Sequence, residues 1–184
     1  DDVALLAWLA ELSQLPQRQQ LWMPSMSTEL YAIAQKRAAN FDVANTCIKL
    51  ALIDTSPALF ATAIDAALSQ QEGLRGTSCE MVLSRYPLEQ LPLALSDARE
   101  LVRLSAITAL NNRGVTAAST IEAALGDESM NVVHAALRAL GELRAADSLS
   151  AIHAFVGAEY DDTTRSIALK TIGAIGDVSS LSLL

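Results

Sequence analysis

Apolar positions in the second half of the chain recur with a nearly constant step. Val102, Val132 and Thr164 each begin a similar stretch, and an alanine follows four positions later in all three. The step from Val102 to Val132 is almost the same as the step from Val132 to Thr164. Because stacked helical hairpins must repeat the same packing geometry, a constant step of this length predicts an array of such hairpins.

Three hairpins are predicted in this region: 98–111 with 116–125, 128–142 with 147–156, and 162–173 with 177–184. The first helix of each hairpin is preceded or opened by an aspartate that can accept free backbone N–H groups. These aspartates are Asp97, Asp127 and Asp162. Glycines are expected to form the turns between paired helices, at Gly114, Gly141 and Gly173–Gly176.

The region 42–95 follows the same rhythm less regularly. Helices are predicted over 42–53 and 56–68, the second opening with Ser56 and Pro57, and 70–76 is predicted to be a flexible loop. A capping box from Thr77 to Glu80 predicts a helix to residue 86, and 88–95 is its short partner.

The segment 1–41 differs in kind from the rest, because it holds both tryptophans. Helices are predicted over 1–15 and 27–40, with a connection or short helix between them and Ser27 as the cap of the second long helix. We therefore expect an N-terminal helical cap over 1–41 and a repeat array over 42–184. The chain ends within an apolar stretch, so we expect it to be a piece of a longer protein.

Composition agrees with close-packed helices. Apolar residues make up 51% of the chain and aromatic residues only 4%, so most of the apolar mass is alanine and leucine. The net charge of −8 and the pI near 4.7 argue against a nucleic-acid partner, since phosphate binding draws on lysine and arginine. No apolar run approaches the roughly 20 residues that a membrane span needs. Cys47 and Cys79 are interpreted as buried thiols in preference to a disulfide.

The repeated residues resemble a known family. An aspartate-initiated helix with Val-Arg, an alanine three residues on, then Ala-Leu-Gly and a second Leu/Ala helix is similar to the HEAT-like repeat, in particular to the short bacterial type named after phycobilisome lyases. The likeness is good over 97–176, moderate over 42–95 and absent over 1–41, with departures at Asn111, Val133 and Thr164. It implies an all-α, right-handed α-solenoid of about five hairpins, whose second helices line the concave side.

If the second helices line one side, polar residues on them should register from repeat to repeat. Several do so at a step that matches that of the first helices, and they would form an acidic, serine-lined surface for a protein or peptide partner of basic character. These candidate partner-binding residues are Asp65, Ser119, Glu122, Asp147, Ser150, His153, Asp177 and Ser180. The alternative is that they are simply the solvated face of any such helix.

The sequence offers no constellation of residues for catalysis, a metal or a cofactor. His134 and His153 lack a metal-ligand spacing and are interpreted as structural. No Gly-x-Ser-x-Gly elbow or phosphate-binding glycine loop is present. The acidic cluster of Glu159, Asp161 and Asp162 is interpreted as a helix cap in preference to a cation site.

A second candidate surface lies near the start, where Trp22, Met23, Met26 and Tyr31 gather. They form either a partner-binding patch or the closure of the first hairpin. The leading hypothesis for function is a non-catalytic protein-interaction scaffold. The resemblance offers one rival, a chromophore-lyase-type subunit or chaperone, and a DNA-binding repeat protein is a second rival that the charge disfavours.

Overall fold

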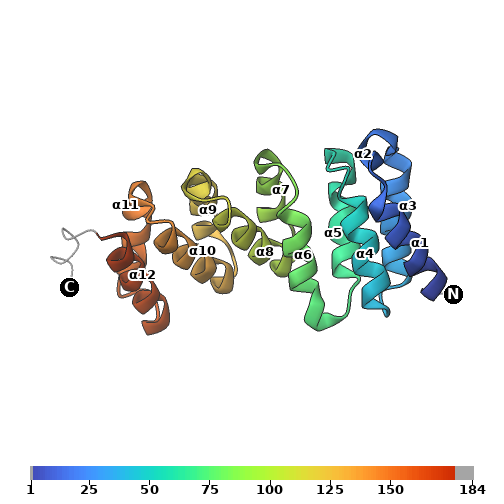
Figure 1. Cartoon of the computed structure of the whole chain (residues 1–184). Helices are drawn as coiled ribbons and strands as arrows, with labels where there is room; N and C mark the ends of the chain where they lie inside the picture. The colour runs from blue at the N-terminus through green and yellow to red at the C-terminus, as the bar shows by residue number, and fades with distance from the viewer. Residues whose placement is uncertain (1, 177–184) are drawn as a thin grey trace. The chain divides into compact units, whose positions relative to one another are not determined.

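The computed structural model describes residues 2–176, and all of the regular secondary structure in that range is helical (Figure 1). The predicted all-α class, an α-solenoid of helical hairpins, is confirmed. The chain divides into two compact units, with the boundary between Gln90 and Leu91. We call residues 2–90 unit 1 and residues 91–176 unit 2. The cap expected over 1–41 lies within unit 1, and the expected helix 177–184 lies outside the described residues.

Unit 2 contains three long helices that alternate with short ones. The long helices are α8 (Glu100–Asn111), α10 (Met130–Glu142) and α12 (Asp162–Ile175). The short ones are α7 (Leu91–Leu95), α9 (Ala118–Glu122) and α11 (Leu149–His153). Short 3₁₀ helices extend α9 and α11 at both ends: η4 (Val115–Ala117), η5 (Ala123–Gly126), η6 (Ala146–Ser148) and η7 (Ala154–Val156).

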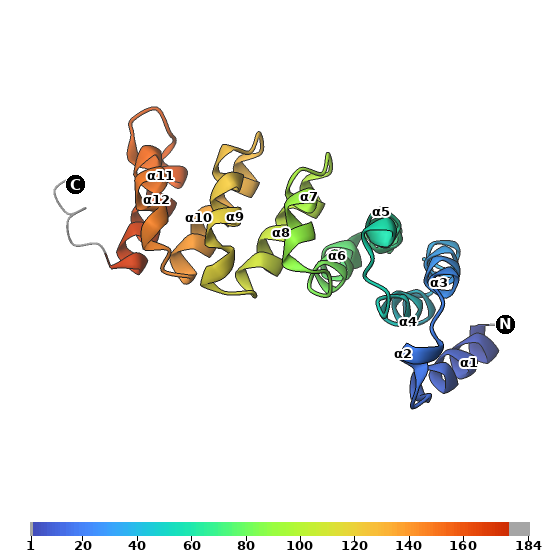
Figure 2. The same cartoon turned by 90° about the horizontal axis from the view of Figure 1, so that it is seen from above.

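These helices form two layers. The long helices α8, α10 and α12 pack side by side in one layer, and α7, α9 and α11 lie in the other (Figures 1 and 2). Each predicted first helix in this region is found within two residues of its expected ends. The second helices predicted over 116–125 and 147–156 are also confirmed, as the composite segments η4–α9–η5 and η6–α11–η7.

Small apolar residues let the long helices approach one another. Ala106, Ala136 and Ala168 occupy the same position in successive repeats, and all three are fully buried. Alanine is the best helix former and adds little bulk between helix axes. On α10, Val132, Ala136 and Leu140 follow one another at the four-residue spacing that places side chains on one face. The repeat pattern in the sequence is therefore the pattern of the buried contacts.

Polar side chains also join neighbouring repeats. The guanidinium of Arg103 on α8 donates from Nε and Nη2 to the carboxylate of Asp127 at 2.8 and 3.0 Å. His134 Nε2 lies 2.8 Å from Thr164 Oγ1, which gives this histidine the structural role expected for it. Asn111 stands where the repeat pattern calls for glycine, and its amide donates to Glu142 of the next repeat at 2.6 Å. Departures from the pattern thus supply contacts between repeats.

The predicted aspartate caps are only partly right. Asp97 accepts the backbone N–H of Arg99, and Asp127 accepts that of Ser129, two residues on in each case. Both carboxylates therefore lie before the helix and order its entry, whereas the N-cap residues of α8 and α10 are Arg99 and Ser129. In the third repeat the cap is Asp161, which accepts the N–H of Thr164 at 2.7 Å, and not Asp162. The interpretation of the acidic cluster as a helix cap is confirmed.

Of the three predicted glycine turns, the one at Gly141 is wrong and the one at Gly173–Gly176 is right only at its second glycine. Gly114 and Gly176 do adopt the left-handed conformation, with φ of 83° and 86°. After α10, however, the left-handed residue is Arg144, and Gly141 lies inside the helix. Gly173 likewise lies inside α12. Glycine at a helix end and glycine at a close helix contact look alike in a sequence.

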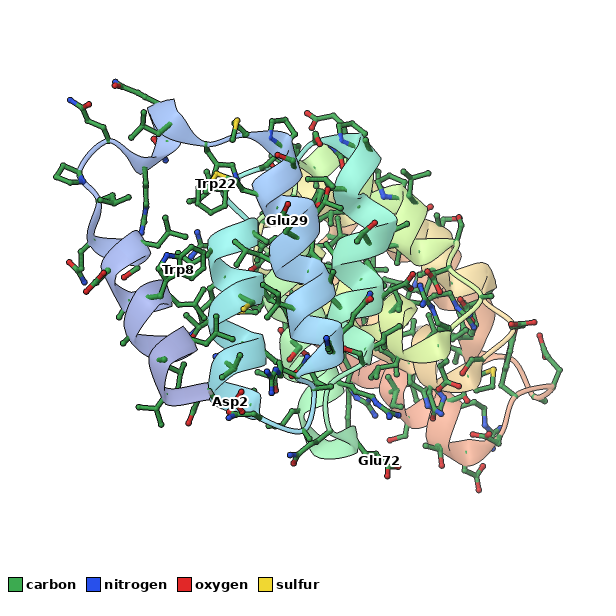
Figure 3. The ribbon with its side chains drawn as sticks, turned by 90° about the vertical axis from the view of Figure 1, so that its right-hand side faces the viewer. Asp2, Trp8, Trp22, Glu29 and Glu72 are labelled. Atoms are coloured by element: carbon green, nitrogen blue, oxygen red, sulfur yellow. The ribbon has the colours of Figure 1, made fainter. Side chains whose placement is uncertain are left out.

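Unit 1, over residues 2–90, is built from six α-helices. They are α1 (Asp2–Gln14), α2 (Arg18–Leu21), α3 (Pro24–Lys36), α4 (Phe41–Ala51), α5 (Phe60–Leu68) and α6 (Arg75–Leu83). Three 3₁₀ helices accompany them: η1 (Pro57–Leu59), η2 (Glu72–Leu74) and η3 (Leu88–Gln90). Helix α4 packs against α1 and α3, and α5 packs against α3 and α6 (Figure 3).

The core of unit 1 is built around two tyrosines. Tyr31 on α3 and Tyr86, which follows α6, are both fully buried. The ring of Tyr86 packs edge-on against Phe60, with 4.9 Å between ring centroids. Burial raises the pKa of Tyr86 to about 12, so its phenol stays neutral at physiological pH. Cys47 and Cys79 are both buried and no disulfide joins them, as interpreted.

Three local predictions in unit 1 are wrong. Helix α3 begins at Pro24, so Ser27 does not cap it; its hydroxyl donates to the carbonyl of Ala51 and accepts from Trp22 Nε1. Helix α6 begins at Arg75, so Thr77 lies inside it and forms no capping box. The segment expected to be a flexible loop over 70–76 contains η2 and the start of α6. Helices α3 and α6 thus begin before the residues predicted to cap them, and the predicted loop is partly helical.

Candidate partner-binding surfaces

The second helices of unit 2 share a common inward face. Ile121 and Ile152 occupy equivalent positions on α9 and α11, and both are fully buried. Three residues further on, Ala124 and Phe155 are buried in the same way. Because helical neighbours lie three and four residues apart, these positions fix which side of α9 and α11 turns away from the long helices.

The opposite side carries the two predicted serines of the described second helices. Ser119 on α9 and Ser150 on α11 are exposed at equivalent positions, and Ala123 and Ala154 are exposed four residues after them. We call this side the second-helix face. Its exposed side chains are small, because serine and alanine are the residues that recur there from one repeat to the next.

Two acidic residues of the predicted set are placed on or beside this face. Glu122 is half-buried, and one of its carboxylate oxygens accepts a hydrogen bond from Ser148 Oγ of the next repeat at 2.6 Å. Asp147 is exposed in η6, directly before Ser148. His153 is half-buried at the position that corresponds to Glu122. The hydrogen bond from Ser148 holds one oxygen of the Glu122 carboxylate in place.

The remaining predicted residues do not belong to the described part of unit 2. Asp65 is exposed on α5 and belongs to unit 1. Asp177 and Ser180 lie outside the described residues. The structure thus places Ser119, Glu122, Asp147, Ser150 and His153 on the second helices of one unit, as expected from their register.

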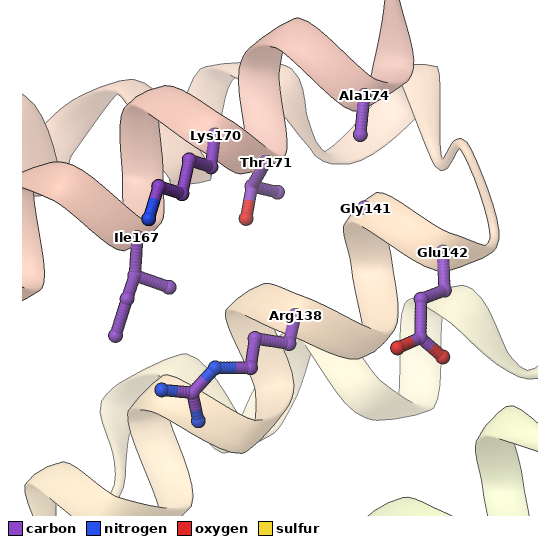
Figure 4. A pocket seen from close by; sticks show the side chains of 7 residues that line it. All are labelled: Arg138, Gly141, Glu142, Ile167, Lys170, Thr171 and Ala174. Atoms are coloured by element: carbon purple, nitrogen blue, oxygen red, sulfur yellow. The ribbon is translucent and has the colours of Figure 1, made fainter.

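A groove between α10 and α12 was not predicted from the sequence. It has a volume of about 320 Å³ and lies in the layer of long helices (Figure 4). Arg138 and Glu142 line it from α10, and Ile167 and Lys170 line it from α12. Arg138 and Lys170 are exposed. They occupy equivalent positions of successive repeats, so alignment of the two repeats could have paired them.

The floor of the groove is set by a close helix contact at Gly141. A Cβ atom on Gly141 would lie 3.3 Å from both Cα and Cγ2 of Thr171. Thr171 is buried, and its hydroxyl donates to the backbone carbonyl of Leu137 on α10 at 3.0 Å. The glycine and this hydrogen bond together bring α10 and α12 close enough to form a shallow floor between charged walls.

The large residues near the start of the chain do not share one environment. Tyr31 is fully buried, whereas Met23 is 59% exposed. Trp22 is half-buried and donates from its indole nitrogen to Ser27 (Figure 3). Tyr31 therefore belongs to the core of unit 1 and Trp22 is hydrogen-bonded to α3, while Met23 is left on the surface, so the four residues do not form one exposed patch.

No helix within residues 2–176 combines the length and apolar character that crossing a membrane requires. Over the same residues, histidine, cysteine and carboxylate side chains do not gather in groups of three or more that could hold a metal ion.

Comparison with known proteins identifies the repeats of unit 2. Residues 88–173 match the family model of HEAT repeats. The match begins in η3 and ends within α12, so it covers the region where the sequence resemblance is strongest. No curated protein matches the chain. The HEAT-like character of this segment is confirmed.

Proposed function

We propose that unit 2 is a non-catalytic protein-interaction module that binds a basic segment of a partner protein along the second-helix face. HEAT repeats generally serve as scaffolds for protein interaction, which supports the general part of the proposal. The particular surface and the basic partner are our inference from the arrangement of side chains.

The observation that carries this proposal is the register of the exposed positions. Ser119 and Ser150, and likewise Ala123 and Ala154, recur at the same place on successive second helices. Small side chains at these positions allow a partner helix or extended segment to approach the α9 and α11 backbones closely. Serine hydroxyls can both donate and accept hydrogen bonds, so they suit a polar partner.

The acidic residues beside the second-helix face favour a basic partner. The carboxylates of Glu122 and Asp147 flank this face, and Glu122 is held in place by Ser148. A lysine or arginine of the partner could bind these carboxylates in charge-assisted hydrogen bonds. The net charge of −8 would also speed the approach of a basic segment. The extension of this surface through Asp65, Asp177 and Ser180 stays a prediction.

The chromophore-lyase or chaperone role implied by the bacterial subtype is the alternative. A tetrapyrrole site needs a large, mostly apolar pocket with a few positioned polar groups. The α10–α12 groove has no aromatic residue among those that line it, which favours the interaction module. Absorbance titration with a bilin tests the alternative directly.

The proposal is tested with two helical peptides of about 15 residues that differ only in carrying lysine or glutamate at the charged positions. We expect the full chain to bind the lysine peptide more tightly in fluorescence anisotropy. The double variant Glu122→Gln/Asp147→Asn should weaken that binding about tenfold, because it removes both charges from the surface. The glutamine that replaces Glu122 can still accept the hydrogen bond from Ser148, so the local structure should be preserved.

The matched control is Glu29→Gln/Glu72→Gln, which removes the same charge from exposed positions of unit 1 (Figure 3). Its affinity for the lysine peptide should equal that of the unmodified chain. Equal losses in the two double variants would show that only the net charge matters, and the second-helix face would no longer be supported.

A further inference from the structure

A pocket in unit 1 lies between the start of the chain, α4 and the segment that follows α6. Its volume is about 370 Å³. Four separate segments contribute to it: the end of α1, helix α2, the second half of α4 with the turn after it, and Arg85 beyond α6. All of these segments belong to unit 1, so the pocket is complete within one compact unit.

Three cationic side chains line this pocket and no carboxylate does. They are Arg18, Lys49 and Arg85. The chain holds 13 lysines and arginines against 21 acidic residues, so a hollow with three cations and no acid runs against its overall charge. Asp54 is the next residue after the lining residue Ile53, but its carboxylate accepts the backbone N–H of Ser56 and does not line the pocket.

The three cations are also left without acidic partners. Among residues 2–176, no carboxylate forms an ion pair with Arg18, Lys49 or Arg85. Arg18 instead donates from Nη1 to the carbonyl of Ser13, which fixes its guanidinium at the edge of the pocket. Other arginines in this range are paired with acids, namely Arg37, Arg99, Arg103 and Arg165. Gathering like charges is unfavourable unless an anion neutralises them.

The remaining lining residues indicate what kind of ligand, beyond its negative charge, the pocket can hold. Gln19 on α2 and Thr46 on α4 carry side chains that can donate hydrogen bonds, whereas the Ser13 hydroxyl already donates to the carbonyl of Ala10. Leu50, Leu52 and Ile53 supply an apolar wall. A volume of about 370 Å³ falls in the range of small-molecule sites, so the pocket has room for more than a single oxyanion.

We propose that this pocket binds the phosphomonoester group of a small organic molecule, with Arg18, Lys49 and Arg85 as the cations that hold it. A phosphomonoester carries nearly two negative charges on three acceptor oxygens at neutral pH, whereas a carboxylate carries one charge on two oxygens. Three cations with further hydroxyl and amide donors therefore match the phosphate better. The apolar wall faces the organic part of the ligand.

This site is independent of the proposed function, because it lies in unit 1 and takes a ligand of the opposite charge. The experiment uses the full chain and O-phosphoserine as the probe, with serine and inorganic phosphate as comparison ligands. Affinity is measured by isothermal titration calorimetry, and amide chemical shifts of α4 report where the probe binds. We expect saturable binding of phosphoserine, weaker binding of inorganic phosphate and none of serine.

The variant Lys49→Gln/Arg85→Gln should lower the affinity for phosphoserine by about tenfold or more, since hydrogen bonds to charged groups are lost. Both side chains are exposed, and far-UV circular dichroism checks that the fold is retained. The matched control Arg138→Gln/Lys170→Gln removes two exposed cations from the α10–α12 groove of unit 2 and should leave the affinity unchanged.

Equal losses in the two double variants, or no loss in Lys49→Gln/Arg85→Gln, would overturn the assignment of the pocket. Inorganic phosphate that binds as tightly as phosphoserine would show that the pocket holds an oxyanion alone, and would overturn the assignment of an organic phosphomonoester. A bound probe that shifts amides of unit 2 and none of α4 would likewise contradict the site.

Discussion

Asp97 and Asp127 occupy the same place in successive repeats, but their surroundings differ. Asp97 pairs with Arg99, whose side chain is 43% exposed. Asp127 pairs with Arg103, and both of these side chains are almost completely buried. The Arg103–Asp127 pair joins α8 to the segment before α10, whereas the Asp97 pair is local. The same residue type therefore contributes to two different kinds of interaction.

We expect Asp127→Ala to lower the free energy of unfolding by about 2 kcal/mol, because it removes two hydrogen bonds from the buried guanidinium of Arg103, which keeps only the backbone carbonyl of Asp97 and the exposed carboxylate of Glu128. Asp97→Ala should cost about 1 kcal/mol, the usual effect of losing a side chain that orders a helix start beside an exposed ion pair. Urea unfolding monitored by circular dichroism measures both. A hydrogen bond from Arg99 holds the pKa of Asp97 below its usual range, so this carboxylate is charged at pH 7.

The two variants serve as each other's control, since they remove the same group from equivalent positions. Equal losses of stability would show that burial of the Arg103–Asp127 pair does not matter. A larger loss in Asp97→Ala would show that the local structure before α8 is the more important of the two.

At the scale of elements, two glycines allow the effect of helix propensity on stability to be told apart from the effect of helix packing. Gly141 and Gly173 lie inside α10 and α12 at equivalent positions of successive repeats. A Cβ atom at Gly141 would press on Cα and Cγ2 of Thr171 at 3.3 Å, whereas a Cβ atom at Gly173 would meet nothing within 4 Å. Backbone atoms cannot move aside as a flexible side chain can, so the first contact requires α10 and α12 to separate.

We expect Gly173→Ala to raise the free energy of unfolding by up to about 1 kcal/mol, the gain from replacing glycine inside a helix. Gly141→Ala receives the same gain but must widen the α10–α12 contact, which costs about 1–3 kcal/mol. The chain with Gly141→Ala should therefore be less stable than the unmodified chain. Thermal unfolding of both variants checks the opposite signs, and a rise in stability for Gly141→Ala would contradict the packing argument.

The helices themselves could be predicted from the sequence, because burial repeats with the helical period. The first helices of the three clear repeats lie within two residues of their expected ends. Capping motifs predicted helix starts less well where a contact with another helix determines the role of the side chain. Ser27 has the sequence context of a helix cap, but its hydroxyl donates a hydrogen bond to the carbonyl of Ala51 on another helix. A single sequence does not show which of these uses a serine has.

The candidate surfaces could be predicted only where residues repeat at equivalent positions along the chain. Ser119 and Ser150 were found because register within a repeat array places equivalent residues on one face. The α10–α12 groove could have been predicted by aligning successive repeats, because the alignment places Arg138 and Lys170 at equivalent positions. The cationic pocket of unit 1 joins four segments without a repeat relationship, and no pattern along the chain points to it.

For the molecule as a whole, the division into two units means that each has its own buried core. In unit 2, α10 packs on α8 and on η5, so it covers apolar residues of the preceding hairpin. A repeat of this kind is stabilised by its neighbours as much as by its own contacts. Stability should therefore depend on how many repeats remain together and not on the presence of any single hairpin.

Fragments of the chain test this dependence. We expect the fragment 91–184 to keep its helical circular dichroism and to unfold cooperatively with urea, because it contains every packed pair of unit 2. The fragment 91–127 ends before Met130 and leaves α8 and η5 without α10, so it should lose most of its helix. The fragment 1–90 is the control for cutting at the boundary between the units. If 91–127 unfolded as cooperatively as 91–184, each hairpin would be stable alone, and a binding surface that runs across repeats would lose its structural basis.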